Sequence, residues 1–264
     1  MNFIKIFLNW SGRYIEKNTS KQEIKNLIKK MKPIAIDKKL IRIGDNNDGG
    51  YILPDDFDRI KHCFSAGVGN LIKFEEDLFK RNKIKSFLCD YNNLSYLTKK
   101  NYFNFTKKKI SCFNDINNIS LNKWINNRIS LKDEFILKID IEGSEFDSLL
   151  NISDDILKKV RILVVEFHSL RDLRNKSFYR IFDNVISRLL HFFYIVHLHP
   201  NNAGKIIEIN NYEFPDLLEI TFYKKNRVSK KRKFKNSYPL DIDQKNIKEK
   251  KDIYLPSYWT RDAL

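Results

Sequence analysis

Short apolar runs alternate with amphipathic segments along most of this chain, and this alternation is the feature that most constrains its fold. The segments between the runs place apolar residues at helical spacing. Strands that alternate with helices are typical of a doubly wound α/β sheet. The sequence predicts seven strands, at residues 62–70, 84–90, 107–113, 135–141, 159–167, 191–199 and 216–225, and intervening helices that include 71–81, 93–101, 120–127, 144–151 and 177–190.

The chain divides into three predicted parts. A helical pattern over residues 19–31 lies in an N-terminal segment, 1–39, ahead of the main domain, 40–226. A basic C-terminal extension, 227–264, is expected to pack on the core or to stay partly loose. The apolar start of the chain is interrupted by Lys5 and is expected to be a packing segment, not an integral membrane span. Three cysteines without CxxC spacing fit buried free thiols and a cytoplasmic protein.

The net charge of +16 raises the question of nucleic-acid binding. In the only dense basic cluster, residues 224–235, aromatic residues are not interleaved at stacking positions, and no nucleic-acid-binding motif accompanies it. We therefore expect a solvated basic face that attracts phosphorylated substrates and no nucleic-acid partner. A basic nucleic-acid-binding α/β module stays open as an alternative.

Glycine is scarce, with 8 in 264 residues, and five of the eight fall in the motifs DGGY, GVG and EGSE. Glycine allows positive φ or close approach of a ligand to the backbone. Gly67 and Gly69 follow the first strand, and Asp90 ends the next, 21 residues after Gly69. This arrangement is typical of a nucleoside-binding sheet and fits NAD or S-adenosylmethionine. Ile72 stands in place of a third glycine, which disfavours an NAD-dependent oxidoreductase.

Several motifs together resemble the FkbM-type S-adenosylmethionine-dependent methyltransferases. In chain order they are RIGDNNDGGYIL, CFSAGVGNLIKFEEDL, LKIDIEGSEFDSLL, VVEFH, VHLHPNN and FPDLLEITFYKK. The resemblance covers about residues 40–226. It implies a class I (Rossmann-like) methyltransferase sheet with strand order 3-2-1-4-5-7-6 and an antiparallel last strand. It also implies O-methylation of small molecules, often of sugars in surface polysaccharide or natural-product pathways.

The resemblance and the spacing together give a set of candidate cofactor contacts. Gly67, Gly69 and Asp90 are expected to contact S-adenosylmethionine, and Asp140 is expected to face its methyl group at the end of the fourth strand. The full predicted cofactor-binding set is Ser65, Gly67, Gly69, Asn70, Asp90 and Asp140.

The candidate catalytic residues are Asp140, Glu142 and His168. Strand alternation predicts that Asp140 and Glu142 point to the same side of the strand. Alternatively, one of them only caps the N-terminus of the following helix, where a carboxylate is favoured. His168 follows a strand and has the right chemistry for a general base. Glu142 is the competing base, and His168 could also be an ordinary loop histidine.

Four further residues, Asp48, Tyr51, His199 and Asn202, are predicted substrate contacts, although DGGY could be only a tight turn. His197 and His199 alternate onto one face, but no cysteine lies nearby and no metal site is predicted. Assistance by a divalent ion stays open.

The sequence therefore predicts a cytoplasmic S-adenosylmethionine-dependent O-methyltransferase that acts on a sugar or nucleotide-linked sugar hydroxyl. Homo-oligomerisation stays open.

Overall fold

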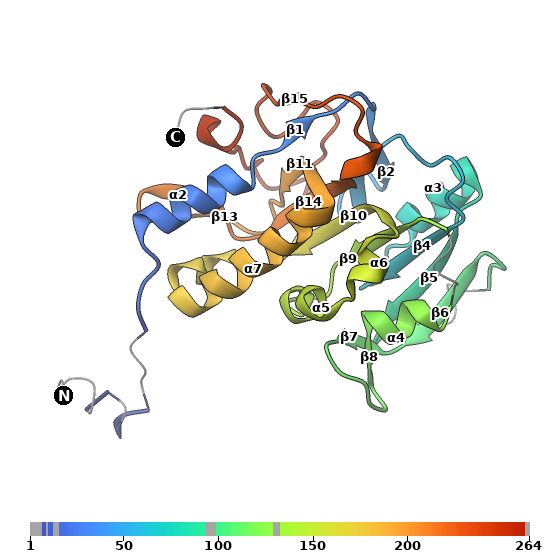
Figure 1. The fold of residues 1–264 in the computed structure, drawn as a ribbon, viewed down its shortest axis with the longest axis horizontal. Coiled ribbons are helices and arrows are strands. Elements are labelled where there is room, and N and C mark those ends of the chain that lie inside the picture. The colour runs from blue at the N-terminus through green and yellow to red at the C-terminus, as the bar shows by residue number, and fades with distance from the viewer. Residues whose placement is uncertain (1–6, 9, 13–15, 93–98, 129–132, 262–264) are drawn as a thin grey trace.

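A seven-stranded mixed sheet forms the centre of the protein (Figure 1). The structure is a computed structural model that describes residues 7–8, 10–12, 16–92, 99–128 and 133–261. The strand order is β11-β14-β10-β9-β4-β5-β6. In chain order the strands are β4 (His62–Ala66), β5 (Lys85–Asp90), β6 (Phe103–Lys107), β9 (Phe135–Ile139), β10 (Val160–Phe167), β11 (Phe193–Pro200) and β14 (Leu218–Lys224).

Strand directions confirm the predicted class I methyltransferase arrangement. The pairs β4–β5, β5–β6, β4–β9 and β9–β10 are parallel. The last strand, β14, is antiparallel to both of its neighbours, β10 and β11. Strand β11 therefore runs in the same direction as β10, and the carboxyl ends of six strands meet at one edge of the sheet, where such folds bind their ligands.

The predicted position of the third strand was wrong. The sheet uses Phe103–Lys107, whereas Lys109–Ser111 forms β7, which pairs with β8 (Asn118–Ser120) in a separate two-stranded sheet. Phe103 is buried and Phe105 packs beside it, so this strand also carries an apolar face. The helix predicted over 93–101 lies largely outside the described residues.

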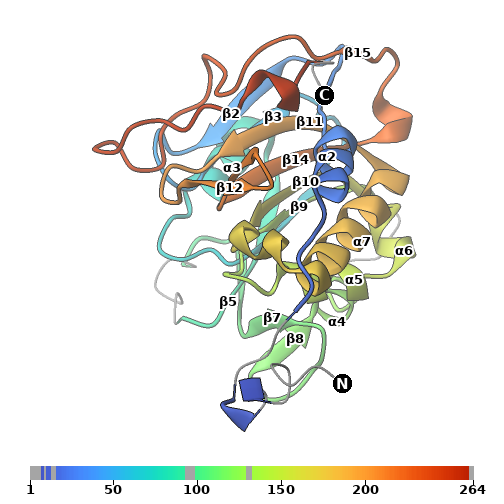
Figure 2. The same cartoon turned by 90° about the vertical axis from the view of Figure 1, so that its left-hand side faces the viewer.

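Helices and a hairpin cover the two faces of the sheet. One face packs against α2 (Lys21–Lys30), α4 (Leu121–Asn126), α5 (Glu145–Asn151), α6 (Asp154–Leu157) and α7 (Lys176–Phe192). The other face packs against α3 (Lys73–Asn82) and the hairpin of β2 (Leu40–Gly44) and β3 (Gly50–Pro54). Figure 2 shows α2 and α7 on the side of the sheet away from this hairpin. Successive residues of the central strands therefore point to different cores.

Smaller elements complete the chain. The connection between β11 and β14 contains a hairpin of β12 (Ile206–Ile209) and β13 (Tyr212–Pro215). The 3₁₀ helices are η2 (Leu170–Arg174), η3 (Lys225–Arg227) and η4 (Ser257–Trp259). No helix among the described residues is both long enough and apolar enough to span a membrane.

The C-terminal extension lies against the core. Its strand β15 (Arg232–Lys233) pairs with β1 (Ile34–Ala35) from the N-terminal part of the chain. Tyr238, Leu255 and Trp259 are buried in the larger core cluster, and the Trp259 ring packs on Phe214 of β13. In Figure 2 this segment, in orange and red, passes over the β2–β3 side of the molecule.

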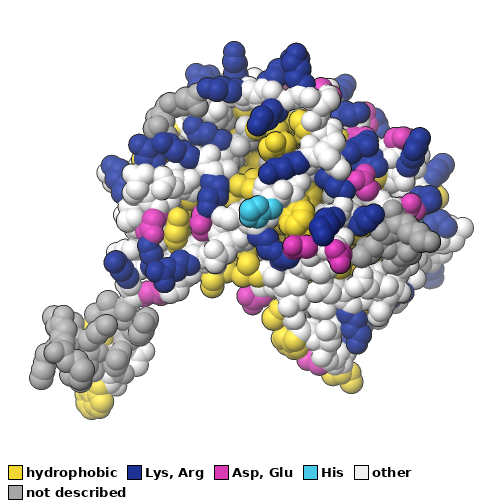
Figure 3. All heavy atoms as spheres, in the orientation of Figure 1, with side chains coloured by type: hydrophobic (Ala, Val, Ile, Leu, Met, Phe, Trp, Pro, Cys, Tyr) yellow, Lys and Arg dark blue, Asp and Glu magenta, His cyan; other side chains and the backbone are white. Residues whose placement is uncertain are grey.

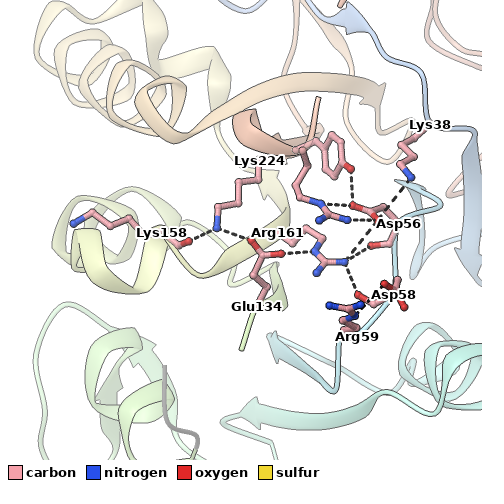
Figure 4. A network of polar contacts seen from close by, with 10 residues as sticks. Lys38, Asp56, Asp58, Arg59, Glu134, Lys158, Arg161 and Lys224 are labelled. Atoms are coloured by element: carbon pink, nitrogen blue, oxygen red, sulfur yellow. Dashed lines mark hydrogen bonds and ion pairs between the residues drawn. The ribbon is translucent and has the colours of Figure 1, made fainter. Parts of the chain in front are cut away.

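Part of the basic cluster at 224–235 is structural. At the amino ends of β9 and β10, the buried carboxylate of Asp56 accepts hydrogen bonds from Arg227 and Tyr223, and Arg161 bridges Asp56 and Glu134 (Figure 4). Lys224 also pairs with Glu134. Elsewhere, Figure 3 shows Lys and Arg side chains spread over one face of the molecule among acidic and apolar ones.

Candidate functional site

A cavity of about 480 Å³ opens at the carboxyl ends of β4, β5 and β9. Eight of the predicted site residues line it: Asp48, Tyr51, Gly67, Gly69, Asn70, Asp90, Asp140 and Glu142. The other four, Ser65, His168, His199 and Asn202, are not among the described residues that line it. The cavity lies at the edge of the sheet where the fold predicts a ligand.

The turn after β4 contains two glycines with different surroundings. A Cβ on Gly67 would lie 1.5 Å from the carbonyl oxygen of Asp140, so this position holds β4 and β9 close together. Gly69 has φ +55°, and a Cβ there would have no atom within 4 Å. Gly67 is therefore required by packing, whereas Gly69 leaves open space beside the cavity.

Asp90 ties the end of β5 to this turn. Its Oδ2 accepts hydrogen bonds from the backbone amides of Val68 and Gly69, both at 2.9 Å. Its Oδ1 accepts one from the amide of Asn92. The carboxylate thus shapes the glycine turn, and Oδ1 keeps a lone pair for a ligand hydroxyl.

Ser65 does not reach the cavity. It is fully buried, and its hydroxyl donates a 2.5 Å hydrogen bond to the buried carboxylate of Glu75 on α3. The structure therefore gives Ser65 a contact beneath the turn instead of a place on the cavity wall.

Asp140 lines the cavity next to the glycine turn, where its carbonyl oxygen lies against Gly67. Its carboxylate accepts a hydrogen bond from the Tyr51 hydroxyl at 3.1 Å. Burial raises the pKa of Asp140 above its ordinary value, and the opposing effects of Lys138 and His168 do not cancel this rise. The Asp140 side chain is 23% exposed and can be reached by a ligand in the cavity.

Lys138 is a cavity residue that the sequence analysis did not single out. It is buried, its ammonium donates to the carbonyl of Gly67 at 3.1 Å, and it lies 5.3 Å from the centre of the Tyr51 ring. The signal was present, because Lys138 precedes Asp140 by two residues in an otherwise apolar strand.

Glu142 reaches the site by a turn and not by strand alternation. Strand β9 ends at Ile139, and Glu142 has a positive φ of +54°. The argument from alternation was therefore wrong for this residue. Its carboxylate nevertheless lies 3.4 Å from His168 Nε2, whose distance to Asp140 Oδ1 is 3.9 Å.

A second residue that sequence analysis missed, Glu145, orients His168. Its buried Oε1 accepts hydrogen bonds from the amides of Ile141 and Gly143 and lies 2.9 Å from His168 Nδ1. Burial lowers the pKa of His168, but Glu145 and then Asp140 and Glu142 outweigh it, so the net shift is upward. Nε2 is left facing the carboxylates.

Glu166, at the end of β10, completes this group of acids. Burial, and then the nearby Asp140 and Glu219, raise its pKa well above the ordinary value. Its Oε1 accepts a hydrogen bond from Asn201 at 2.8 Å. Ligand atoms of Asp140, Glu166 and His168 all lie within 4.8 Å of one another.

His199 and Asn202 bind the C-terminal extension. His199 Nε2 lies 2.9 Å from Asn246 Oδ1, and the Asn202 side chain donates to the backbone carbonyl of Ile247 and accepts from its backbone amide. The structure therefore does not bring these two residues to the cavity. Asn246 does connect to it, because its amide donates to Asp48 on the cavity wall.

The strand order, the reversed strand β14 and the cavity at the carboxyl ends of the strands define a class I methyltransferase fold. Residues 1–196 match the family model of the methyltransferase FkbM domain. This match spans most of the chain, so the protein belongs to the FkbM methyltransferase family.

Comparison with curated proteins finds no match. Among solved structures, the FkbM methyltransferase of Methylobacillus flagellatus KT is 12% identical, with a TM-score of 0.39 over 61% of this chain and 44% of that one. A fibrillarin pre-rRNA processing protein of Methanococcus jannaschii is 13% identical, with a TM-score of 0.41 over 72% and 83%. The chain thus spans less than half of the Methylobacillus protein, and similarity at this level says nothing about substrate.

Proposed function

We propose that this protein is an S-adenosylmethionine-dependent O-methyltransferase that acts on a hydroxyl of a sugar or nucleotide-linked sugar, in surface polysaccharide or natural-product biosynthesis. The observation that carries the proposal is one cavity that is lined by two kinds of residues. The glycine turn and Asp90 form one part of its lining, and Asp140 and Glu142 form another part. Its volume of about 480 Å³ suits a small-molecule ligand.

The wall formed by the glycine turn suits an adenosine group. Gly69 leaves open space for a ligand to approach the backbone, and Asp90 Oδ1 can accept a hydrogen bond from a ribose hydroxyl. Bound S-adenosylmethionine would supply an electrophilic methyl group.

The part of the lining that contains Asp140 and Glu142 suits a neutral polar acceptor. Asp48 and Glu142 offer carboxylates that can orient sugar hydroxyls by hydrogen bonds. As the acceptor oxygen gains the methyl group, its O–H bond breaks and the proton needs a base. The two candidate bases are Glu142, which lines the cavity, and His168, whose Nε2 lies 3.4 Å from the Glu142 carboxylate.

The other two functions considered have less support. An NAD-dependent oxidoreductase would use a third glycine at the start of α3, where this chain has Ile72. A nucleic-acid-binding module would need the basic cluster free for phosphates, but Lys224 and Arg227 form ion pairs with Glu134 and Asp56.

Calorimetric titration with S-adenosylhomocysteine and with NAD tests the cofactor. We expect S-adenosylhomocysteine to bind, and Asp90→Ala to weaken it by about 1.5–3 kcal/mol, or roughly 10- to 150-fold in Kd. Asp77→Ala, which removes a carboxylate from the outer surface of α3, is the matched control and should bind as wild type. Equal affinities for the two variants would remove Asp90 from the site, and binding of NAD alone would reject the proposal.

The acceptor is tested by methyl transfer from labelled S-adenosylmethionine to a panel of free and nucleotide-linked sugars. The panel includes amino-sugar analogues in which one hydroxyl is replaced by an amine. Mass spectrometry of the products should place the methyl group on oxygen. Methylation of the amines alone would show an N-methyltransferase instead.

A further inference from the structure

Three side chains from two neighbouring strands converge beside the cavity. Asp140 follows β9, while Glu166 and His168 lie at the carboxyl end of β10, which is parallel to β9. Each side chain offers one ligand atom, and these atoms lie within 4.8 Å of one another. Two carboxylate oxygens and one imidazole nitrogen at this spacing can contact a single ion.

The histidine is held in the orientation that a metal ligand needs. Glu145, whose side chain is fully buried, lies 2.9 Å from His168 Nδ1 and is itself fixed by two backbone amides. In metal sites, the non-coordinating ring nitrogen of histidine usually donates to such a carboxylate, which fixes the tautomer and the ring orientation. Nε2 is then free to coordinate.

Glu166 is the second, independent indication of a ligand. It is 4% exposed, and among the described residues Asn201 donates a hydrogen bond to its Oε1. Its second oxygen has no such donor and is available as a ligand atom. Buried carboxylates are usually paired or bound to a metal.

We propose that Asp140, Glu166 and His168 bind one divalent transition-metal ion, such as Mn²⁺, on the acceptor side of the cavity. The sequence analysis predicted no metal site. The three ligands of the proposed site come from two separate motifs, LKIDIEGSEFDSLL and VVEFH. A mixed set of imidazole and carboxylate ligands favours Mn²⁺ over Mg²⁺, which prefers oxygen ligands and its own water shell.

The role of the ion rests on the proposed function, but its binding does not. Three protein ligands leave coordination positions for an acceptor hydroxyl, whose acidity the ion would raise. With the His168 lone pair used for coordination, the hydroxyl proton would pass to Glu142, whose side chain is 85% exposed, and from there to water. Glu145 would act as a positioning residue through His168.

The test is titration of the metal-stripped full chain with Mn²⁺, without cofactor or acceptor, followed by calorimetry and by electron paramagnetic resonance. Glu166→Gln keeps the oxygen that accepts from Asn201 and loses only charge and one ligand. His168→Gln removes the imidazole, and Glu145→Gln weakens its support. Glu75→Gln, a change at another fully buried carboxylate, is the matched control. Circular dichroism and thermal unfolding verify that each variant folds.

We expect one saturable site per wild-type chain, with affinity reduced about 10- to 100-fold in Glu145→Gln and at least tenfold in the two ligand variants. Glu75→Gln should bind within twofold of wild type. Spin-echo modulation from a coordinated nitrogen should be present in wild type and absent in His168→Gln. Absence of saturable binding, or equal affinity in wild type and Glu166→Gln, would overturn the metal site and leave the proposed methyl transfer untouched. Conversely, tight Mn²⁺ binding by a chain that methylates no hydroxyl would reject only the proposed function.

Discussion

The hydrogen bonds that hold the C-terminal extension give the most quantitative prediction. The Asp243 carboxylate, 2% exposed, lies 3.1 Å from His197 Nε2 and 3.4 Å from His199 Nδ1, and it accepts a 2.7 Å hydrogen bond from the amide of Leu240. Asp243→Asn preserves the shape of this side chain but removes its charge. It also replaces one acceptor oxygen by a donor amide nitrogen, so it tests the whole polar contact of Asp243 with β11.

The expected cost follows from burial. Burial alone would raise the pKa of Asp243, but His197 and His199 hold it well below its ordinary value. Removing one partner of a buried ion pair costs about 3–5 kcal/mol, and the retained hydrogen bonds place Asp243→Asn at the lower end. A loss of about 3 kcal/mol in the free energy of unfolding lowers Tm by about 6–12 °C in a domain of this size.

The pH dependence has a definite sign. Burial lowers the pKa of His199, but Glu219 and Asp243 together raise it to about 9. A raised histidine pKa stabilises the fold fully below the unfolded value of about 6.5, and this stabilisation disappears as pH rises through 9. The wild-type free energy of unfolding should therefore fall by up to about 3 kcal/mol between pH 6.5 and 9.5. Asp243→Asn should show a smaller fall.

Urea unfolding across this pH range, followed by limited proteolysis of the extension, measures both effects. Asp241→Asn, at an exposed position two residues away, is the matched control and should match wild type within about 0.5 kcal/mol. A wild-type stability that does not change between pH 6.5 and 9.5 would refute the charged state assigned to His199. Equal stability of the two variants would refute the assigned contribution of Asp243.

Two further predictions concern the glycine turn and the basic cluster. Gly67→Ala should destabilise the protein by about 3 kcal/mol or more, because its Cβ would lie 1.5 Å from the Asp140 carbonyl oxygen. Gly69→Ala should cost only about 1–2 kcal/mol, because only its left-handed backbone disfavours a side chain. Urea unfolding of both variants measures the two losses. Residues 224–235 should bind single-stranded RNA only weakly, with affinity falling steeply with salt, because Lys224 and Arg227 are used in ion pairs. Tight binding that persists at about 200 mM salt in a filter-binding assay would contradict this.

Local sequence determined the elements that depend on local chemistry. Apolar alternation located six of the seven sheet strands, because burial of a strand face leaves a repeat in the chain itself. It misplaced the third strand, since Phe103–Lys107 and Lys109–Ser111 are adjacent segments that can both form strands and only tertiary pairing distinguishes them. Gly67, Gly69 and Asp90 were also found locally, because a tight turn between a strand and a helix requires particular residues.

Only the tertiary structure shows which side chains from distant parts of the chain contact one another. Glu145 is the last residue of the motif EGSE, yet its contact with His168 joins residues 23 positions apart and leaves no repeat in the local sequence. The sequence predicted that His199 contacts the substrate, but its ring lies against Asn246, which is 47 residues further along the chain. Sequence patterns record which face of an element is buried, because burial acts on each residue separately. They do not record what buries it, because that depends on how distant segments pack in three dimensions.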